Sequence, residues 1–457
     1  MKQHLEKPSI SPFTRFMALV LQGILFSVIY QVSNGYADSN QVNQVMATHL
    51  DTMIPLIPWM IVPYLSSGAY FLLAYWFIDN RTDFHFLNQC LLLSTVIAGW
   101  SFYFYPLFFG ELAINIAYPW KLGFDLIGAV DKPFNQAPSL HVMYGVVLGV
   151  IFVKRFTGWR RVLIVGGIAL MVASTLFVHQ HHLVDVVSGL ALASIICLVS
   201  QKVAISGLAL IYFTLASSCM LLGLEVGSVV HIIFYGLCYL ALGFALISIA
   251  YQTNCVRLLG KGSRGELKTP SKLLLAPYRL VYWLFWRWQV SKDTTPVNAF
   301  LPWLGVGRRL TGKELSEQKS LTHIIDLGAE LPSDYRLKSQ WYGDCVKPIY
   351  ISLPVLDLQP ITFDDALALC CKLNEIHESS DDVQVYLHCT MGLSRSYAML
   401  ACYLAFSGFG SAVEVKEKIW DLNPNAVIRA SYLSNDLLDR LTRGGLLARV
   451  TGAQTGT

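Results

Sequence analysis

Charged side chains are scarce in this sequence. Asp, Glu, Lys and Arg make up only 14% of the 457 residues, whereas 54% are hydrophobic and the mean hydropathy is +0.48. Such a composition is too apolar for a soluble enzyme and indicates a membrane protein. The net charge of +4 is small and spread along the chain, so we expect no nucleic-acid partner.

Several other signals are missing. The ten cysteines show no paired spacing typical of a metal site, and we expect neither a metal nor another cofactor. The first apolar run lacks a small-residue cleavage site, which argues against a cleavable signal peptide. The apolar excess is confined to the first half, and the charge density after Val256 is that of a soluble domain. The sequence thus predicts a multi-pass α-helical membrane domain followed by a soluble α/β domain.

Residues 1–251 are predicted to form the membrane domain, because apolar stretches of about 20 residues are long enough to cross a bilayer. Basic residues cluster in alternate loops, which places these loops and both chain ends in the cytoplasm. No cysteine lies in a predicted external loop, in agreement with a reducing cytoplasmic side. We expect a bacterial-type inner (plasma) membrane protein. The predicted spans, about eight, lie near 16–32, 56–78, 87–109, 138–154, 162–178, 183–200, 205–223 and 229–251.

Two polar clusters interrupt the apolar half, both on the predicted external side. Pro138-Ser139-Leu140-His141 opens the fourth span, and His181 precedes Asp185 by four residues at the start of the sixth. Ionisable groups at the mouth of a span are costly unless they have a function or a partner. Residues four apart share a face of a helix, so Asp185 can fix the tautomer of the His181 ring. His181 is a candidate nucleophile or base, and His141 a candidate acid.

These clusters resemble the histidine motifs of the type 2 phosphatidic acid phosphatase superfamily, in particular its inositol phosphorylceramide and sphingomyelin synthase branch. By that resemblance His181 forms a phosphohistidine, Asp185 orients it and His141 protonates the leaving group. Two features depart from the family. Thr175 stands where the hydrolases have an arginine, and their upstream lysine–arginine–proline motif is absent. Without that phosphate clamp, transfer between lipid head groups is as open as hydrolysis, and a degenerate membrane anchor is the alternative.

A strand, a tight loop and a helix start follow one another after residue 383. The apolar run ends at His388-Cys389, five residues follow, and the predicted helix starts at Arg395-Ser396. This order aims backbone N–H groups and the positive end of a helix dipole at one point. A thiol held there ionises easily, and Arg395 can grip two phosphate oxygens at once. The residues predicted to bind phosphate are Thr390, Met391, Gly392, Leu393, Ser394 and Arg395.

This loop resembles the signature of cysteine-dependent protein tyrosine phosphatases, in particular the dual-specificity branch. By that resemblance Cys389 attacks phosphorus, Arg395 binds the phosphoryl oxygens and Ser396 eases release of the thiolate. The family also uses an aspartate from a separate upstream loop as general acid, and Asp357 stands in that place. The loop carries no Lys, no His and no second Arg. That favours a singly phosphorylated target over a polyphosphorylated inositol lipid.

Residues 252–294 are predicted to join the two halves. Their first part is rich in Gly, Lys and Arg and is interpreted as a flexible connector near the inner leaflet. The stretch 271–289 is rich in Trp and Tyr, carries basic residues and is broken by Pro277. This mixture favours an interfacial helix in the head-group region. The alternative, a ninth span, would place the cysteine domain outside the cell.

Residues 295–450 alternate between strand and helix patterns, as in a helix-flanked sheet. Asp326 lies near the end of one of the strands and Glu330 just after it, and both are interpreted as capping or pairing residues. The predicted strands are 303–306, 323–327, 348–353 and 383–387, and the predicted helices are 362–378, 396–407, 411–421 and 431–442.

The leading hypothesis is an integral membrane phosphatase that hydrolyses phosphomonoesters through a cysteinyl-phosphate in the cytoplasm. Its target is protein phosphotyrosine or phosphoserine, or a simple phospholipid phosphate, and tethering at the membrane favours membrane-bound substrates. One alternative is a lipid head-group phosphotransferase that works mainly through the membrane histidines. Another is a non-catalytic membrane regulator that binds phosphorylated partners. The expected partners are the lipid bilayer and a phosphorylated protein or phospholipid; the oligomeric state is unknown from sequence.

Overall fold

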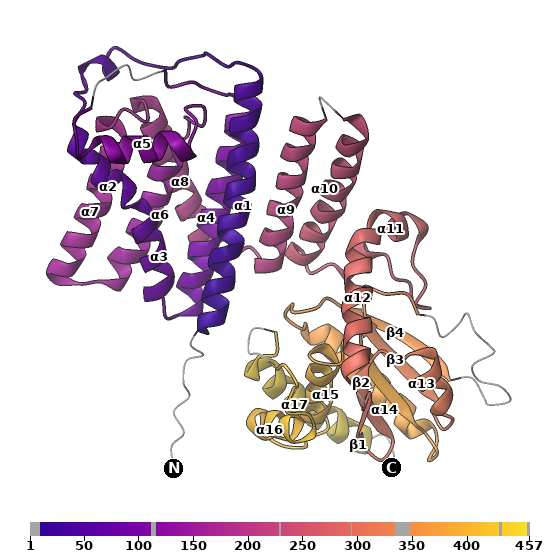
Figure 1. Cartoon of the computed structure of the whole chain (residues 1–457). Coiled ribbons are helices and arrows are strands. Elements are labelled where there is room, and N and C mark those ends of the chain that lie inside the picture. The colour runs from indigo at the N-terminus through magenta and orange to yellow at the C-terminus, as the bar shows by residue number, and fades with distance from the viewer. Residues whose placement is uncertain are drawn as a thin grey trace. The chain divides into compact units, whose positions relative to one another are not determined.

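The computed structural model describes residues 10–110, 116–227, 230–293, 295–333, 348–428 and 432–454. The chain divides into two compact units, Met1–Ser248 and Ile249–Thr457. In the described residues the first unit consists of helices and loops, and the second contains the sheet (Figure 1).

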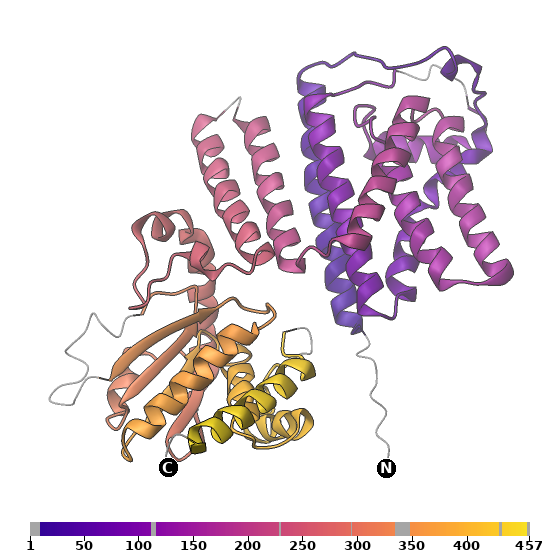
Figure 2. The same ribbon diagram turned by 180° about the vertical axis from the view of Figure 1, so that it is seen from behind.

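The N-terminal unit is a bundle in which the long helix α1 runs alongside α4 (Figure 1, Figure 2). Two short 3₁₀ turns, Asp51–Met53 and Pro58–Met60, follow α1. The helices are α1 (Pro12–Ser39), α2 (Ile61–Leu65), α3 (Ser67–Phe77), α4 (Arg81–Phe104), α5 (Lys121–Val130), α6 (Leu140–Arg155), α7 (Gly158–Phe177), α8 (Leu183–Lys202), α9 (Gly207–Val226) and α10 (His231–Gln252).

Seven segments of the described chain are long and apolar enough to cross a membrane: α1, Pro58–Phe77, α4, α7, α8, α9 and α10. The difference from the predicted eight is the fourth span, which forms the 16-residue helix α6. Pro138 has no N–H to donate, and the helix begins only at Leu140, with Ser139 as its N-cap. Its length of about 24 Å is less than a hydrocarbon core of about 30 Å. α6 nevertheless packs against α4, α7 and α8.

The two ends of α6 carry different chemistry. His141 lies in its first turn, and Lys154 and Arg155 lie in its last. Arg155 Nη2 lies 2.6 Å from Asp79 Oδ2, and Arg15 Nη2 lies 3.6 Å from the other oxygen of the same carboxylate. His141 and Arg155 are separated by roughly 21 Å along the helix axis, at about 1.5 Å per residue. The histidine end and the basic end of this bundle are therefore opposite each other.

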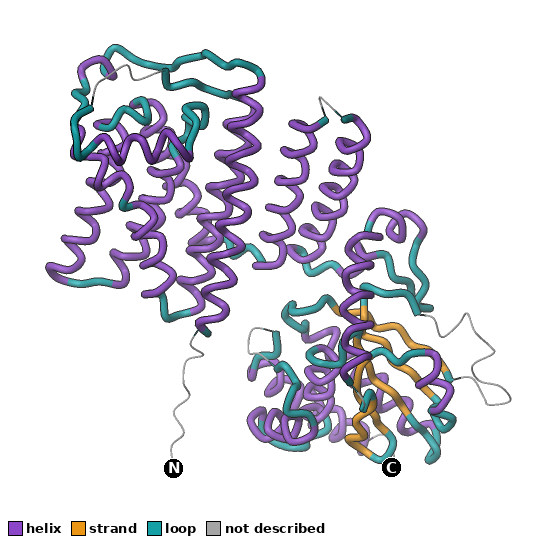
Figure 3. The backbone as a smooth tube through the Cα atoms, viewed as in Figure 1, coloured by secondary structure: helices purple, strands orange, loops and turns teal. Residues whose placement is uncertain are grey.

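The C-terminal unit is built on a mixed five-stranded sheet with the order β1-β2-β5-β3-β4. The strands of this unit are orange in Figure 3. β2, β5, β3 and β4 are parallel neighbours, and β1 pairs antiparallel with β2. The four predicted strands are present; β1 is additional, because it is a partly buried edge strand that forms only by pairing with β2. The strands are β1 (Val297–Leu301), β2 (Leu304–Arg308), β3 (His323–Gly328), β4 (Ile349–Val355) and β5 (Val385–Cys389).

Helices cover both faces of this sheet, since successive residues of a strand point to opposite sides. Val385 and Leu387 of β5 belong to the core formed with α14 to α17, whereas Tyr386 packs with Leu315 of α13. All twelve residues of α15 are buried, which fixes the start of this helix beside the end of β5. The helices are α11 (Thr269–Leu274), α12 (Ala276–Lys292), α13 (Gly312–Glu317), α14 (Phe363–Ser379), α15 (Arg395–Phe406), α16 (Ala412–Leu422) and α17 (Asn435–Gln454), with a 3₁₀ turn at Val256–Leu259.

The predicted joining segment, 252–294, packs within the C-terminal unit. Lys261 Nζ lies 2.7 Å from Asp326 Oδ2, and the Lys261 side chain is only 1% exposed. Arg279 of α12 donates from Nε to the backbone oxygen of Glu330 at 2.9 Å. Buried cations require such partners. The connector predicted to be flexible is therefore anchored to the sheet through two of its basic residues.

Candidate functional site

The loop between β5 and α15 begins at Cys389 and ends at Arg395. Gly392, within it, has a φ of +67°, a conformation that glycine adopts without steric cost, and any Cβ there would collide with the backbone of Arg308. The Gly392 N–H donates to Cys389 Sγ at 3.2 Å. The sulfur therefore lies where loop amides and the dipole of α15 favour negative charge.

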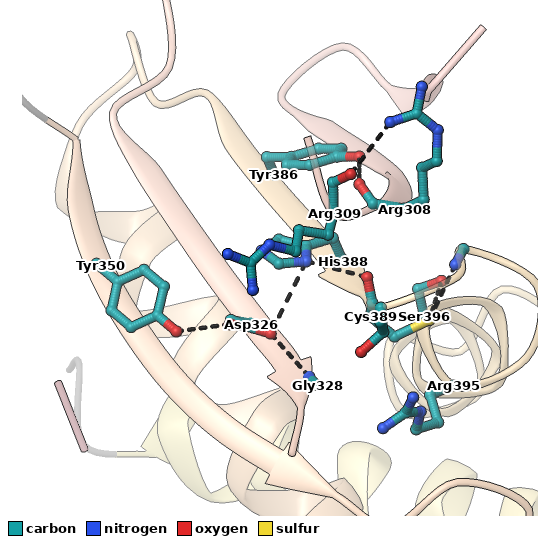
Figure 4. A network of polar contacts seen from close by, with 12 residues as sticks. Arg308, Arg309, Asp326, Gly328, Tyr350, Tyr386, His388, Cys389, Arg395 and Ser396 are labelled. Carbon is teal, nitrogen blue, oxygen red and sulfur yellow. Dashed lines mark hydrogen bonds and ion pairs between the residues drawn. The ribbon is translucent and has the colours of Figure 1, made fainter. Parts of the chain in front are cut away.

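Two polar residues contact Cys389 (Figure 4). Ser396 Oγ lies 3.6 Å from Cys389 Sγ, and His388 Nδ1 lies 3.2 Å from the backbone oxygen of Cys389. Burial lowers the pKa of His388, and the nearby carboxylate of Asp326, 3.8 Å from Nδ1, opposes that shift. The Ser396 hydroxyl thus contacts the sulfur directly, whereas His388 contacts the backbone oxygen of Cys389.

Arg395 is buried and held by two carboxylates. Its Nη1 lies 2.9 and 3.2 Å from the two carboxylate oxygens of Glu330 and donates to the backbone oxygen of Val355 at 3.0 Å. Its Nε lies 3.3 Å from Asp357 Oδ1. Burial alone would lower the pKa of this guanidinium, but the charges of Glu330 and Asp357 hold it well above its usual value. A permanent cation is thereby fixed beside the cysteine loop.

Asp357 comes to the loop from the segment that follows β4. Leu358, next to it, has a φ of +57°, so the chain turns sharply there, and the aspartate side chain meets Ser394, whose Oγ donates to Asp357 Oδ1 at 3.0 Å. The fold thus brings Asp357, predicted from a separate part of the sequence, to the loop that carries Cys389, Arg395 and Ser396.

The remaining loop residues make different contacts. Thr390 Oγ1 donates to Glu330 Oε2 at 2.9 Å, and the Leu393 backbone oxygen accepts from Val427 N at 2.7 Å. Met391 is partly buried. Of the six residues predicted to bind phosphate, Gly392 has its N–H directed at the sulfur, and Arg395 supplies the cation.

Glu330 has a larger part in this site than the sequence indicated. The sequence predicts a capping or pairing role for Glu330, and its completely buried carboxylate pairs with Arg395 and Thr390. A sequence signal for this was available. Glu330 closely follows β3, the parallel neighbour of β5, and the carboxyl ends of parallel strands meet at one edge of a sheet.

The membrane-unit histidines also come together. The ring centroids of His141 and His181 are 6.2 Å apart, and both side chains line a cavity of about 440 Å³. Asp185 differs from the expectation of a shared helix face. Its Oδ2 accepts the His182 N–H at 2.7 Å and lies 3.7 Å from His181 Nδ1. α8 begins only at Leu183, so His181 precedes the helix. The Asp185 carboxylate therefore caps the first turn of α8 and does not share a helical face with His181.

Asp131 is a further polar residue of this cavity, and the sequence did not point to it. Both of its carboxylate oxygens lie 2.9 Å from the Tyr30 hydroxyl, which donates to them, and Asn34 Nδ2 lies 3.3 Å away. Burial raises the pKa of the Asp131 carboxyl, and the hydrogen bond from Tyr30 opposes that shift. An adjoining hollow of about 490 Å³ shares Asp131 and His181 and is also lined by Lys121 and Lys132.

No protein-family model and no curated protein matches this chain. Solved structures do match. Tk-PTP in its active form is 18% identical over 33% of this chain and 99% of its own, with a TM-score of 0.28. PTPMT1 in complex with PI(5)P is 19% identical over 32% of this chain and 94% of its own, with a TM-score of 0.25. Human DUSP28 is 15% identical over 33% of this chain and 96% of its own, with a TM-score of 0.27. Each similarity covers about a third of this chain and nearly all of the relative.

Proposed function

We propose that the C-terminal unit is a cysteine-dependent phosphomonoesterase of the dual-specificity type. The observation that carries this proposal is the Cys389 sulfur, which accepts an amide hydrogen bond at the start of α15 inside a loop that also holds Arg395. Asp357 supplies a carboxyl group at the same loop. The proposal thus assigns the nucleophile and the anion-binding cation to one loop and the proton donor to Asp357, which contacts that loop.

In the first step the Cys389 thiolate attacks the phosphorus of the substrate. A sulfur–phosphorus bond forms as the bond from phosphorus to the leaving oxygen breaks, and Asp357 gives that oxygen a proton. Arg395 and the loop amides stabilise the charge on the phosphoryl oxygens. In the second step water attacks phosphorus with Asp357 as base, inorganic phosphate leaves, and the Ser396 hydroxyl stabilises the departing thiolate.

The test is turnover of a generic aryl phosphate by the full-length protein and its Cys389→Ser variant. Turnover is expected in the natural protein and loss by at least about 10⁴-fold in the variant, because the nucleophile is gone. Acid-quenched phosphoenzyme should be found only when Cys389 is present. An unchanged rate in the variant would refute the assignment of Cys389, and absence of turnover in the natural protein would favour the non-catalytic regulator.

A second candidate function belongs to the membrane unit, where the two histidines face one cavity. We propose, from the resemblance to the type 2 phosphatidic acid phosphatases, that His181 accepts a phosphoryl group, Asp185 orients it and His141 protonates the leaving group. The 3.7 Å between His181 Nδ1 and Asp185 Oδ2 requires a small closure on substrate binding. Transfer of a lipid head group that is lost in His181→Ala and kept in Cys389→Ser would support this function.

We further propose that the basic end of the bundle is cytoplasmic and that the histidine end is external, by the positive-inside rule. The cysteine site then works in a reducing compartment. A C-terminal tag that reacts with an impermeant label in intact cells would contradict this orientation.

A further inference from the structure

α12 has two faces of opposite character. Its inner face is buried against the sheet domain, where Tyr278 and Trp286 are 5% and 7% exposed. Its outer face presents six large apolar side chains, which are between 44% and 57% exposed and cannot all be covered by the unit itself. They are Leu280, Val281, Trp283, Leu284, Phe285 and Trp288.

The inner face is attached to the catalytic loop from two sides. Arg279 Nε donates to the backbone oxygen of Glu330, the residue whose carboxylate holds Arg395. Trp286 Nε1 donates to the backbone oxygen of Arg309 at 3.0 Å, and the Arg309 N–H lies 3.4 Å from the backbone oxygen of Thr390 in the loop. α12 is thus part of the wall of the cysteine site.

Tyr282, on the same inner face, shows how close that wall lies to the reacting groups. Burial, and next the carboxylate of Glu330, raise the pKa of its hydroxyl well above the usual value, and the charges of Asp357 and Arg395 also act on it. A helix with its side chains is about 10–12 Å across. The thickness of α12 therefore lies between its outer face and the wall of the cysteine site.

The charge of α12 and its position in the chain indicate which surface matches its outer face. α12 contains no acidic residue, and it carries Arg287 and Lys292, both exposed. An apolar face with basic residues beside it matches an anionic lipid leaflet. The same unit begins within the last turn of α10, a helix long and apolar enough to span the bilayer. The chain therefore leaves the bilayer shortly before α12.

We propose that the outer face of α12 lies on the inner leaflet and that the cysteine site takes its substrate from that leaflet, as a lipid phosphomonoester. This inference rests on the proposed phosphatase function and deepens it. Lipid phosphates lie in the head-group region, at the depth of an interfacial helix. A terminal phosphate that extends beyond the head groups has to pass α12 before it meets Arg395.

The experiment uses the full-length protein in phosphatidylcholine vesicles that contain phosphatidylglycerol phosphate. A His181→Ala background removes any contribution from the membrane site. The outer-face variant is Leu284→Glu with Trp288→Glu, and the matched control is Val413→Glu on α16, a residue that is 57% exposed elsewhere on the unit. Turnover of soluble aryl phosphate is measured in parallel, because it reports an intact fold and an active cysteine.

The ratio of lipid to aryl phosphate turnover should fall at least about tenfold in the outer-face variant, because charge opposes entry into the head-group region. It should stay within about twofold in the control. An unchanged ratio in the outer-face variant would overturn the inference, as would hydrolysis of a phosphotyrosine peptide in preference to the lipid. Absence of aryl phosphate turnover in the natural protein would instead refute the underlying phosphatase function.

Discussion

The two candidate sites differ in how completely their polar groups are paired. Around the cysteine, Arg395 Nη1 contacts Glu330 and Val355 at 2.9–3.2 Å, whereas its Nε, 3.3 Å from Asp357 Oδ1, is buried without a hydrogen bond among the described residues. Around the histidines, His181 Nδ1 and Asp185 Oδ1 are buried and lack a hydrogen-bond partner among the described residues. A site whose groups are already fixed needs little rearrangement in the transition state. The histidine site, with unpaired groups beside a cavity, depends more on what binds there.

Paired substitutions test this comparison most strongly. Cys389→Ser should abolish aryl phosphate turnover, by at least about 10⁴-fold, and His181→Ala should leave it within about twofold, because the two sites lie in different units. Assays of both variants against soluble aryl phosphate and against a lipid head-group acceptor give the result. Loss of aryl phosphate turnover in His181→Ala would show that the sites are not independent.

The next largest effect is expected at the proposed proton donor. Asp357→Ala should slow hydrolysis of alkyl phosphates by a factor on the order of 10²–10⁴ and should slow aryl phosphates with acidic phenols much less, since those leaving groups depart without a proton. The measurement is kcat against leaving-group pKa. An equal loss for every leaving group would assign Asp357 to holding Arg395 rather than to proton transfer.

A smaller effect should follow from loosening the arginine. Glu330→Gln removes the charge that is paired with Arg395 and should lower kcat by about tenfold, because a hydrogen bond between charged groups is stronger than one to a neutral group. The matched control is Glu317→Gln, an exposed residue of α13. kcat and KM are to be measured separately, each with and without inorganic phosphate as an inhibitor. A variant with the kcat of the natural protein would show that the loop alone positions the guanidinium.

The smallest effect concerns stability below neutral pH. Burial alone would raise the pKa of Asp326, but Lys261 and His388 hold it well below its ordinary value of about 3.9. A depressed folded pKa stabilises the unit above the unfolded pKa, and this contribution is lost as pH falls through the folded pKa. Between pH 5 and pH 2 the free energy of unfolding should therefore fall more steeply with decreasing pH in the natural protein than in Asp326→Asn. Equal slopes would exclude this ion pair as the acid-labile one.

Much of the cysteine site could be predicted from sequence because its groups are local. Cys389, Gly392, Arg395 and Ser396 lie within eight residues of one another, and a strand, loop and helix in that order has one geometry. Glu330 was harder to assign. It contacts Arg395 only because β3 lies beside β5. The residues of the two strands do not by themselves specify that they are neighbours.

The membrane unit shows the reverse. Most of its predicted spans form long apolar helices, as a bilayer requires, but the fourth forms the shorter α6. The polar cluster is assembled from distant helices. Asp131 meets Tyr30, about a hundred positions earlier in the chain, through helix packing. The same holds for the start of α8, where Asp185 caps the helix and His181 is left outside it.

The sequence by itself determined where the chain is apolar, where it becomes an α/β domain and which cysteine and arginine share a loop, because hydropathy and short-range spacing are local properties. Only the tertiary structure decided that Glu330 and Asp357 grip that arginine and that α12 presents one face to the site and an apolar face outward. Those contacts join residues that are far apart along the chain, and they depend on how helices and strands pack.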